Sequence, residues 1–124
     1  MKVRGVVWVG TRTAAFEETV RFFGDVLGIE LERISADFAW SRMPNSSQLE
    51  VFGPGDLDHL DFTTGPVPEF LVDDLAAGIE ELRTAGVEIL GKPVADDGEG
   101  NGWVHFRAPD GNVYGLTTGP EYRR

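Results

Sequence analysis

Two stretches of sequence, FEETVRFFGDVLGIEL at residues 16–31 and LAAGIEELRTAGVEI at residues 75–89, repeat one pattern and decide the fold. In each stretch apolar residues recur at spacings of four and three, which places them on one face of a helix, and a glycine then ends the helix. The matching apolar positions, offset by 59 residues, are Phe16, Val20 and Phe23 against Leu75, Ile79 and Leu82. The chain is therefore predicted to contain two similar modules.

Short strand patterns surround each predicted helix. β-Branched, aromatic and alternating apolar residues predict strands at 3–10, 29–34, 37–42 and 48–52 in the first half. The same features predict strands at 66–72, 87–90, 103–107 and 113–117 in the second half. Each half therefore has the order βαβββ, as module one at about 1–55 and module two at about 65–120 of a single domain, 1–124. We expect an α+β fold in which curved sheets surround a cleft and one helix per module lies outside.

Composition and charge limit the classes of function. The 124 residues, 41% of them hydrophobic, suffice for one domain with a real core. The formal net charge is −10 and no basic patch is visible, so we expect no nucleic-acid partner and no membrane partner. The absence of cysteine excludes disulfides and thiolate chemistry. With no apolar targeting segment at the start, we expect a cytoplasmic protein whose partners are a small molecule and a second copy in a homodimer.

Several short motifs along the chain resemble the vicinal oxygen chelate superfamily, which includes glyoxalases, bleomycin-resistance proteins and extradiol dioxygenases. The motifs are Val9, Phe22–Gly28, Leu49–Gly53, Phe70–Leu75 and Phe106–Tyr114. The resemblance covers almost the whole chain and implies two βαβββ modules around a cleft. Because one fold hosts many reactions, the function has to be argued from the site.

The resemblance also implies where a metal ion would bind. Metal-dependent members of the family take one ligand, usually His or Glu, from the first and the last strand of each module. The matching positions here are Arg4, Glu50, Val67 and Gly115. Arginine, valine and glycine offer no donor to a cation, so only the glutamate is a candidate ligand. We expect no metal cofactor, and the alternative is a divalent metal held with His59 or His105 if the strand register is shifted.

Side-chain alternation along the strands assigns a set of residues to the cleft wall. If Glu50 faces the cleft, Gln48 and Phe52 do so too, whereas the alternative is a glutamate on a solvated face. The same parity adds Arg4, Val6, Trp8, Val67, Glu69, Leu71, Trp103, His105 and Arg107. Arg4 would then oppose Glu50, either as a structural ion pair whose loss destabilises the protein or as a clamp for an anionic ligand group.

Two functions fit this set of residues. The first is a metal-independent small-molecule binding protein, of the type used for drug sequestration, with an aromatic-lined cleft. Its rings would be Trp8, Trp40, Phe52 and Trp103, for which core packing is the alternative. The second is a glyoxalase-like lyase, isomerase or dioxygenase. It would use Glu50 with a metal, or Glu50 and His105 as an acid/base pair, although a histidine in a strand is often structural.

Overall fold

The computed structural model describes residues 1–122 of the chain. The first module contains β1 (Val3–Arg12), α1 (Phe16–Asp25), β2 (Glu32–Ser35), β3 (Phe38–Arg42) and β4 (Gln48–Phe52). The second contains β5 (Val67–Val72), α2 (Leu75–Thr84), β6 (Glu88–Val94), β7 (Gly102–Arg107) and β8 (Val113–Thr118), followed by the short 3₁₀ helix η1 (Pro120–Tyr122). The predicted α+β fold of two βαβββ modules is confirmed.

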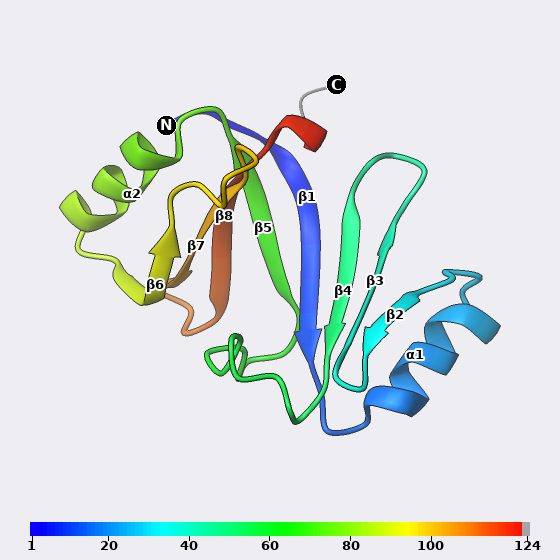
Figure 1. Ribbon diagram of the computed structural model, residues 1–124. Coiled ribbons are helices and arrows are strands. Elements are labelled where there is room, and N and C mark those ends of the chain that lie inside the picture. The colour runs from blue at the N-terminus through cyan, green and yellow to red at the C-terminus, as the bar shows by residue number, and fades with distance from the viewer. Residues whose placement is uncertain (123–124) are drawn as a thin grey trace.

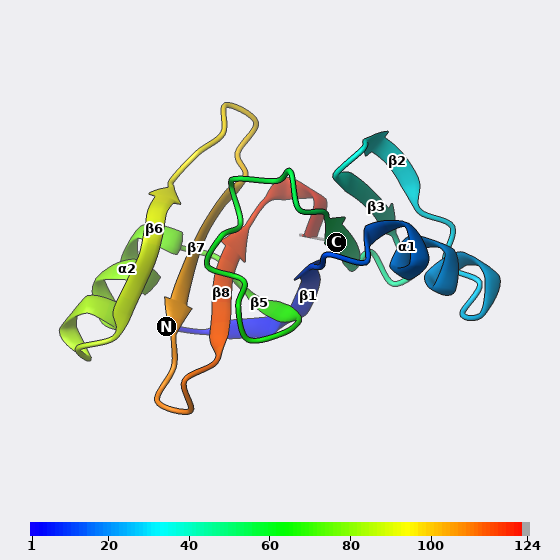
Figure 2. The same cartoon turned by 90° about the horizontal axis from the view of Figure 1, so that it is seen from below.

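All eight strands belong to one curved sheet, in the order β2-β3-β4-β1-β5-β8-β7-β6 (Figure 1). The two modules join where their first strands, β1 and β5, pair antiparallel. Within each module the first strand pairs in parallel with the last, β1 with β4 and β5 with β8. The modules are therefore similar internally, and the sheet encloses a concave side between them (Figure 2).

The two helices lie at opposite ends of the molecule, where each covers the sheet of its own module (Figure 1). Phe16 and Val20 of α1 pack against Val51 of β4. The cluster under α2 consists of Val72, Leu75, Ile79, Leu82, Val104 and Leu116. These contacts use the apolar positions whose spacing predicts the helices. No helix within residues 1–122 has the length and apolar character needed to cross a membrane.

The first strand departs from the regular alternation that the sequence suggests. Between Val3 and Gly5, and again between Val6 and Trp8, β1 contains one residue more than β5. Each such bulge reverses the face on which the following side chains lie. Trp8 consequently pairs with Glu69 and is buried, whereas Val6 is 52% exposed. The predicted orientation of 3–10 is wrong for Val6, and it is also wrong for the bulged residue Arg4.

Candidate functional site

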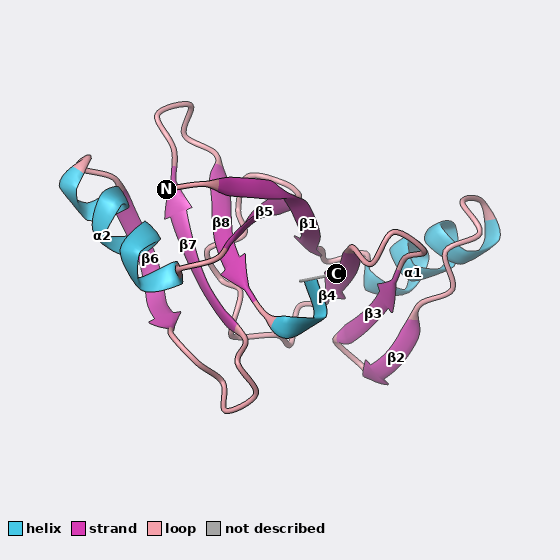
Figure 3. Ribbon diagram, turned by 90° about the horizontal axis from the view of Figure 1, so that it is seen from above, coloured by secondary structure: helices cyan, strands magenta, loops and turns pink. Residues whose placement is uncertain are grey.

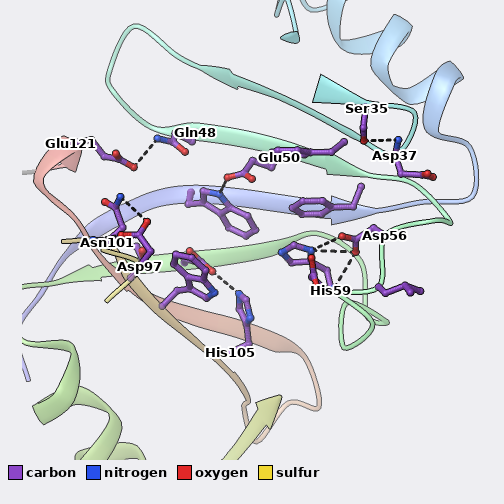
Figure 4. A pocket seen from close by; sticks show the side chains of 18 of the residues that line it. Ser35, Asp37, Gln48, Glu50, Asp56, His59, Asp97, Asn101, His105 and Glu121 are labelled. Carbon is purple, nitrogen blue, oxygen red and sulfur yellow. Dashed lines mark hydrogen bonds and ion pairs between the residues drawn. The ribbon is translucent and has the colours of Figure 1, made fainter. Parts of the chain in front are cut away.

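A cavity of about 670 Å³ lies on the concave side of the sheet (Figure 4). Both modules, the segment between β4 and β5, and η1 contribute to its wall. The carboxylates that line it are Asp37, Glu50, Asp56, Asp58, Glu69, Asp97 and Glu121. The lining residues, all within the described range 1–122, include two histidines but no lysine and no arginine. The wall therefore carries an excess of negative charge, which favours a ligand that carries positive charge.

Seven of the nine site residues predicted from the sequence line this cavity. They are Trp8, Gln48, Glu50, Phe52, Glu69, Trp103 and His105. Trp40 pairs with Glu50 across β3 and β4 but is not among the lining residues that the structure describes. The roles of the seven in binding or catalysis stay predictions.

Arg4 lies outside the cavity. Its guanidinium is exposed and forms an ion pair with Asp73, with Nη2 2.6 Å from Oδ2. The bulge between Val3 and Gly5 accounts for this position, because it takes Arg4 out of the alternating pattern. The expected pair between Arg4 and Glu50 is therefore wrong.

The separation of Arg4 from Glu50 predicts the outcome of a double-mutant cycle on these two residues. Because Arg4 and Glu50 share no contact, the effects of Arg4→Met and Glu50→Gln on the free energy of unfolding should add, with a coupling energy of zero within error. Urea denaturation of the two single variants and the double variant measures it. A substantial coupling energy would place Arg4 back beside Glu50.

Arg107 also lies outside the cavity, although its predicted face is correct. It pairs with Val113 at the far end of β7, beyond His105. There its Nη1 donates to the carbonyl of Gly111 at 2.9 Å, and its Nε lies 3.3 Å from Oε2 of Glu88. Arg107 therefore fixes the turn between β7 and β8 and does not line the site.

Glu50 projects from β4 and is held by a residue of β1. The indole Nε1–H of Trp8 donates a hydrogen bond to Oε2 of Glu50. Burial raises the pKa of Glu50 to about 7, the bond from Trp8 opposes this rise, and the negative charges of Glu69 and Glu121 add to it. A carboxyl group with such a pKa gains or loses a proton close to neutral pH.

Glu69 on β5 and His105 on β7 form a second polar pair in the wall. Nε2 of His105 lies 2.6 Å from Oε2 of Glu69, whose side chain is only 5% exposed. Burial raises the pKa of Glu69, and the hydrogen bond and charge interaction with His105 oppose this rise. Gly115 leaves the room for this pair, because a Cβ at that position would lie 2.7 Å from Cγ of Glu69 and 3.0 Å from Cδ2 of His105.

The segment between β4 and β5 adds a second imidazole, His59, to the wall. Its Nδ1 lies 3.0 Å from Oδ1 of Asp56, and its ring stacks on Phe52 with the ring centroids 3.7 Å apart. Phe52 in turn stacks on Phe38. Sequence reasoning gave His59 little weight, because an irregular segment has no period that would bring it next to a strand residue. The aspartate three positions before it was the one local signal.

The C-terminal 3₁₀ helix η1 lies beside β4 (Figure 3) and contributes Glu121 and Tyr122 to the wall of the cavity. Nε2 of Gln48 donates to Oε1 of Glu121 at 3.1 Å. Tyr122 also lines the cavity; burial raises the pKa of its hydroxyl, and the charge of Glu121 raises it further. Sequence reasoning missed Glu121 and Tyr122, because a three-residue turn after the last strand carries no pattern.

The fold agrees with a comparison against protein families. Residues 5–115 match the model of the Glyoxalase/Bleomycin resistance protein/Dioxygenase superfamily. The chain belongs to this superfamily, which confirms the resemblance seen in the sequence. No curated protein matches the chain in a sequence search.

Solved structures with the same fold include enzymes of different kinds. Methylmalonyl-CoA epimerase of Streptomyces coelicolor, in complex with 2-nitronate-propionyl-CoA, matches with a TM-score of 0.67 and 16% identity over 96% of this chain and 99% of that chain. A Mn(II)-bound glyoxalase of Novosphingobium aromaticivorans matches with a TM-score of 0.70 and 20% identity over 94% of this chain and 39% of that chain. Methylmalonyl-CoA epimerase of Mycobacterium tuberculosis matches with a TM-score of 0.69 and 20% identity over 94% of this chain and 89% of that chain. At these identities the likeness establishes the fold alone.

The side chains on the first and last strands of the modules do not fit a metal ion. These strands, β1, β4, β5 and β8, carry Trp8, Glu50, Glu69 and Gly115, and the first three of these residues line the cavity. The ligand positions of the first strands are therefore occupied by Trp8 and Glu69, and not by Arg4 and Val67 as expected from the sequence. An indole N–H donates a hydrogen bond and offers no lone pair. Among residues 1–122 no three His, Asp or Glu side chains are grouped so that they could hold a metal ion.

Proposed function

We propose that this protein binds an organic cation with a flat aromatic part, without a metal ion, in the cavity between its two modules. The observation that supports this most strongly is the composition of the wall, where seven carboxylates accompany aromatic rings and the described lining residues include no lysine or arginine. Such a wall attracts positive charge and repels anions.

The rings give the cavity a second means of selection. Trp103, Tyr122 and Phe52 line it, and aromatic faces attract both cations and flat ring systems. The volume of about 670 Å³ is in the ordinary range for small-molecule sites. Since both predicted arginines lie elsewhere, an anionic ligand group would meet no guanidinium among the lining residues within 1–122.

A panel of polycyclic and glycopeptide compounds tests the binding function. We expect at least one cationic member to quench the tryptophan fluorescence, because Trp8 and Trp103 line the cavity, and to raise the melting temperature. Glu121→Gln should weaken that binding, whereas the exposed control Glu30→Gln should not. Absence of both quenching and thermal shift with every member would contradict the proposal.

Proton transfer is a second candidate function, as in an isomerase. It is favoured by the pKa of about 7 of Glu50 and by His105 in the same cavity. Glu50 would take a proton from a carbon next to a carbonyl group, and His105 would return one. Proton transfer can be distinguished from binding alone by hydrogen exchange. In D₂O the protein would catalyse the replacement of hydrogen on that carbon by deuterium. Glu50→Gln would stop this exchange.

Two further expectations from the sequence, a homodimer and a cytoplasmic location, stay predictions. The cavity wall described above consists of residues of one chain, and sedimentation at micromolar concentration tests the homodimer.

A further inference from the structure

The centre of the cavity holds an indole where the metal-dependent relatives suggested by the sequence resemblance would place a metal ligand. Trp8 is 6% exposed and contacts rings from three parts of the chain. Its ring centroid lies 6.4 Å from that of Phe52, 6.0 Å from Phe62 and 6.4 Å from His105. Neighbours on so many sides fix the position of the indole.

Gly10 makes this position available. A Cβ at residue 10 would lie 2.0 Å from Cη2 of Trp8, so the indole lies directly across the glycine. Gly10 also pairs with Glu50 across β1 and β4. The indole therefore extends along the cavity face of β1 toward the carboxylate, which its Nε1–H reaches. Any side chain larger than hydrogen at residue 10 would displace it.

We propose that Trp8 is a positioning residue that takes the place of a metal ion in this cavity. Its ring fills the centre of the site, and its N–H orients the Glu50 carboxylate toward an organic ligand. This inference rests on the proposed metal-free binding function and gives it a structural cause.

The contacts of Glu50 show why an N–H at this point matters. The charged groups that act on Glu50 are the carboxylates Glu69 on β5 and Glu121 on η1, which repel its charge. A cation in the centre would satisfy this group of carboxylates in a metal protein. Here the indole supplies a partial positive charge on its N–H, and it does so without a lone pair that would bind a metal.

Titration with MnCl₂ and NiCl₂ alone tests the proposal by calorimetry. We expect no stoichiometric binding to the wild-type protein or to Trp8→Phe. Trp8→His places an imidazole beside Glu50 and Glu69, and we expect it to bind Ni²⁺ at least about tenfold more tightly than the wild type. Adding Glu50→Gln to this variant should remove the gain.

Two results would overturn the proposal. The first is wild-type binding of one Mn²⁺ or Ni²⁺ that Glu50→Gln abolishes. The second is a Trp8→His variant that is folded by circular dichroism yet binds Ni²⁺ no better than the wild type. The titrations contain no organic ligand, so their outcome does not depend on whether the protein binds an organic cation.

A spectroscopic measurement keeps the test valid if Trp8→His does not fold. In ¹H–¹⁵N spectra of the wild type, the indole proton of Trp8 should lie downfield of those of Trp40 and Trp103, because it bonds to a carboxylate. Glu50→Gln should move this signal upfield and leave that of Trp103 in place. A Trp8 signal that Glu50→Gln does not move would overturn the proposal as well.

Discussion

Replacing Glu50 by glutamine is expected to raise the free energy of unfolding at pH 8 by about 3 kcal/mol. The pKa of this carboxyl is raised from 4.5 to about 7 in the folded protein, chiefly by burial. Ionising it therefore costs more in the folded than in the unfolded state. Glutamine keeps an oxygen that accepts the bond from Trp8 and has no charge to bury.

The sign of this effect fixes its pH window. Well below pH 4.5 the carboxyl is protonated in both states and the substitution changes little. As the pH rises to about 7 the unfolded state loses its proton first, so the wild type loses stability that Glu50→Gln retains. Urea denaturation at pH 4.5, 6, 7 and 8 measures the difference. A Glu50→Gln protein that is less stable than the wild type at pH 8 would contradict the burial of this carboxyl group, whose described partner is the neutral indole of Trp8.

His105→Ala is expected to lower the free energy of unfolding at pH 8 by about 3 kcal/mol or more. Glu69 is 4% exposed and would lose the imidazole that lies 2.6 Å from its Oε2. A buried carboxylate without a partner is costly, and the missing ring leaves a void beside Gly115. Urea denaturation measures the loss.

A double-mutant cycle separates the energy of the Glu69–His105 interaction from the cost of the void that the missing ring leaves. Glu69→Gln removes the charge, so His105→Ala should cost at least about 1 kcal/mol less in a Glu69→Gln background than in the wild type. His105→Gln, which retains an N–H donor, should lie between the wild type and His105→Ala. Equal costs of His105→Ala in both backgrounds would show that Glu69 does not depend on His105.

The fold was predictable from the sequence because its signals are local. The spacings of Phe16, Val20 and Phe23, and of Leu75, Ile79 and Leu82, require only that each helix bury one face, and they do so in the structure. The merging of two modules into one sheet was not predictable, since it depends on the pairing of β1 with β5 over a long separation in the chain.

The site was predictable mainly where strands alternate regularly, although Trp8 on the bulged strand β1 also lines the cavity as predicted. Gln48, Glu50 and Phe52 occupy the predicted face of β4, and Trp103 and His105 that of β7. Arg4 was misplaced because a bulge depends on the partner strand and leaves no mark in the alternation.

Other parts of the site depend on contacts between distant residues. Gly10 and Gly115 look like ordinary strand glycines in the sequence, yet each makes room for a side chain that crosses it, Trp8 and Glu69 respectively. The resemblance to the family therefore assigned the ligand positions of the second module to Val67 and Gly115. In the structure the side chain of Glu69 occupies the space beside Gly115. His59 reaches the cavity through stacking on Phe52, which no local pattern predicts.

A matched pair of ligands tests the central claim most directly. N-methylacridinium and 9-methylanthracene have similar flat rings and differ in charge. We titrate each into the wild-type protein in the presence of EDTA and follow tryptophan fluorescence. The account predicts that the cation binds at least about tenfold more tightly than the neutral compound, with an affinity that EDTA does not change. Equal affinities for the two compounds, or cation binding that EDTA abolishes, would contradict it.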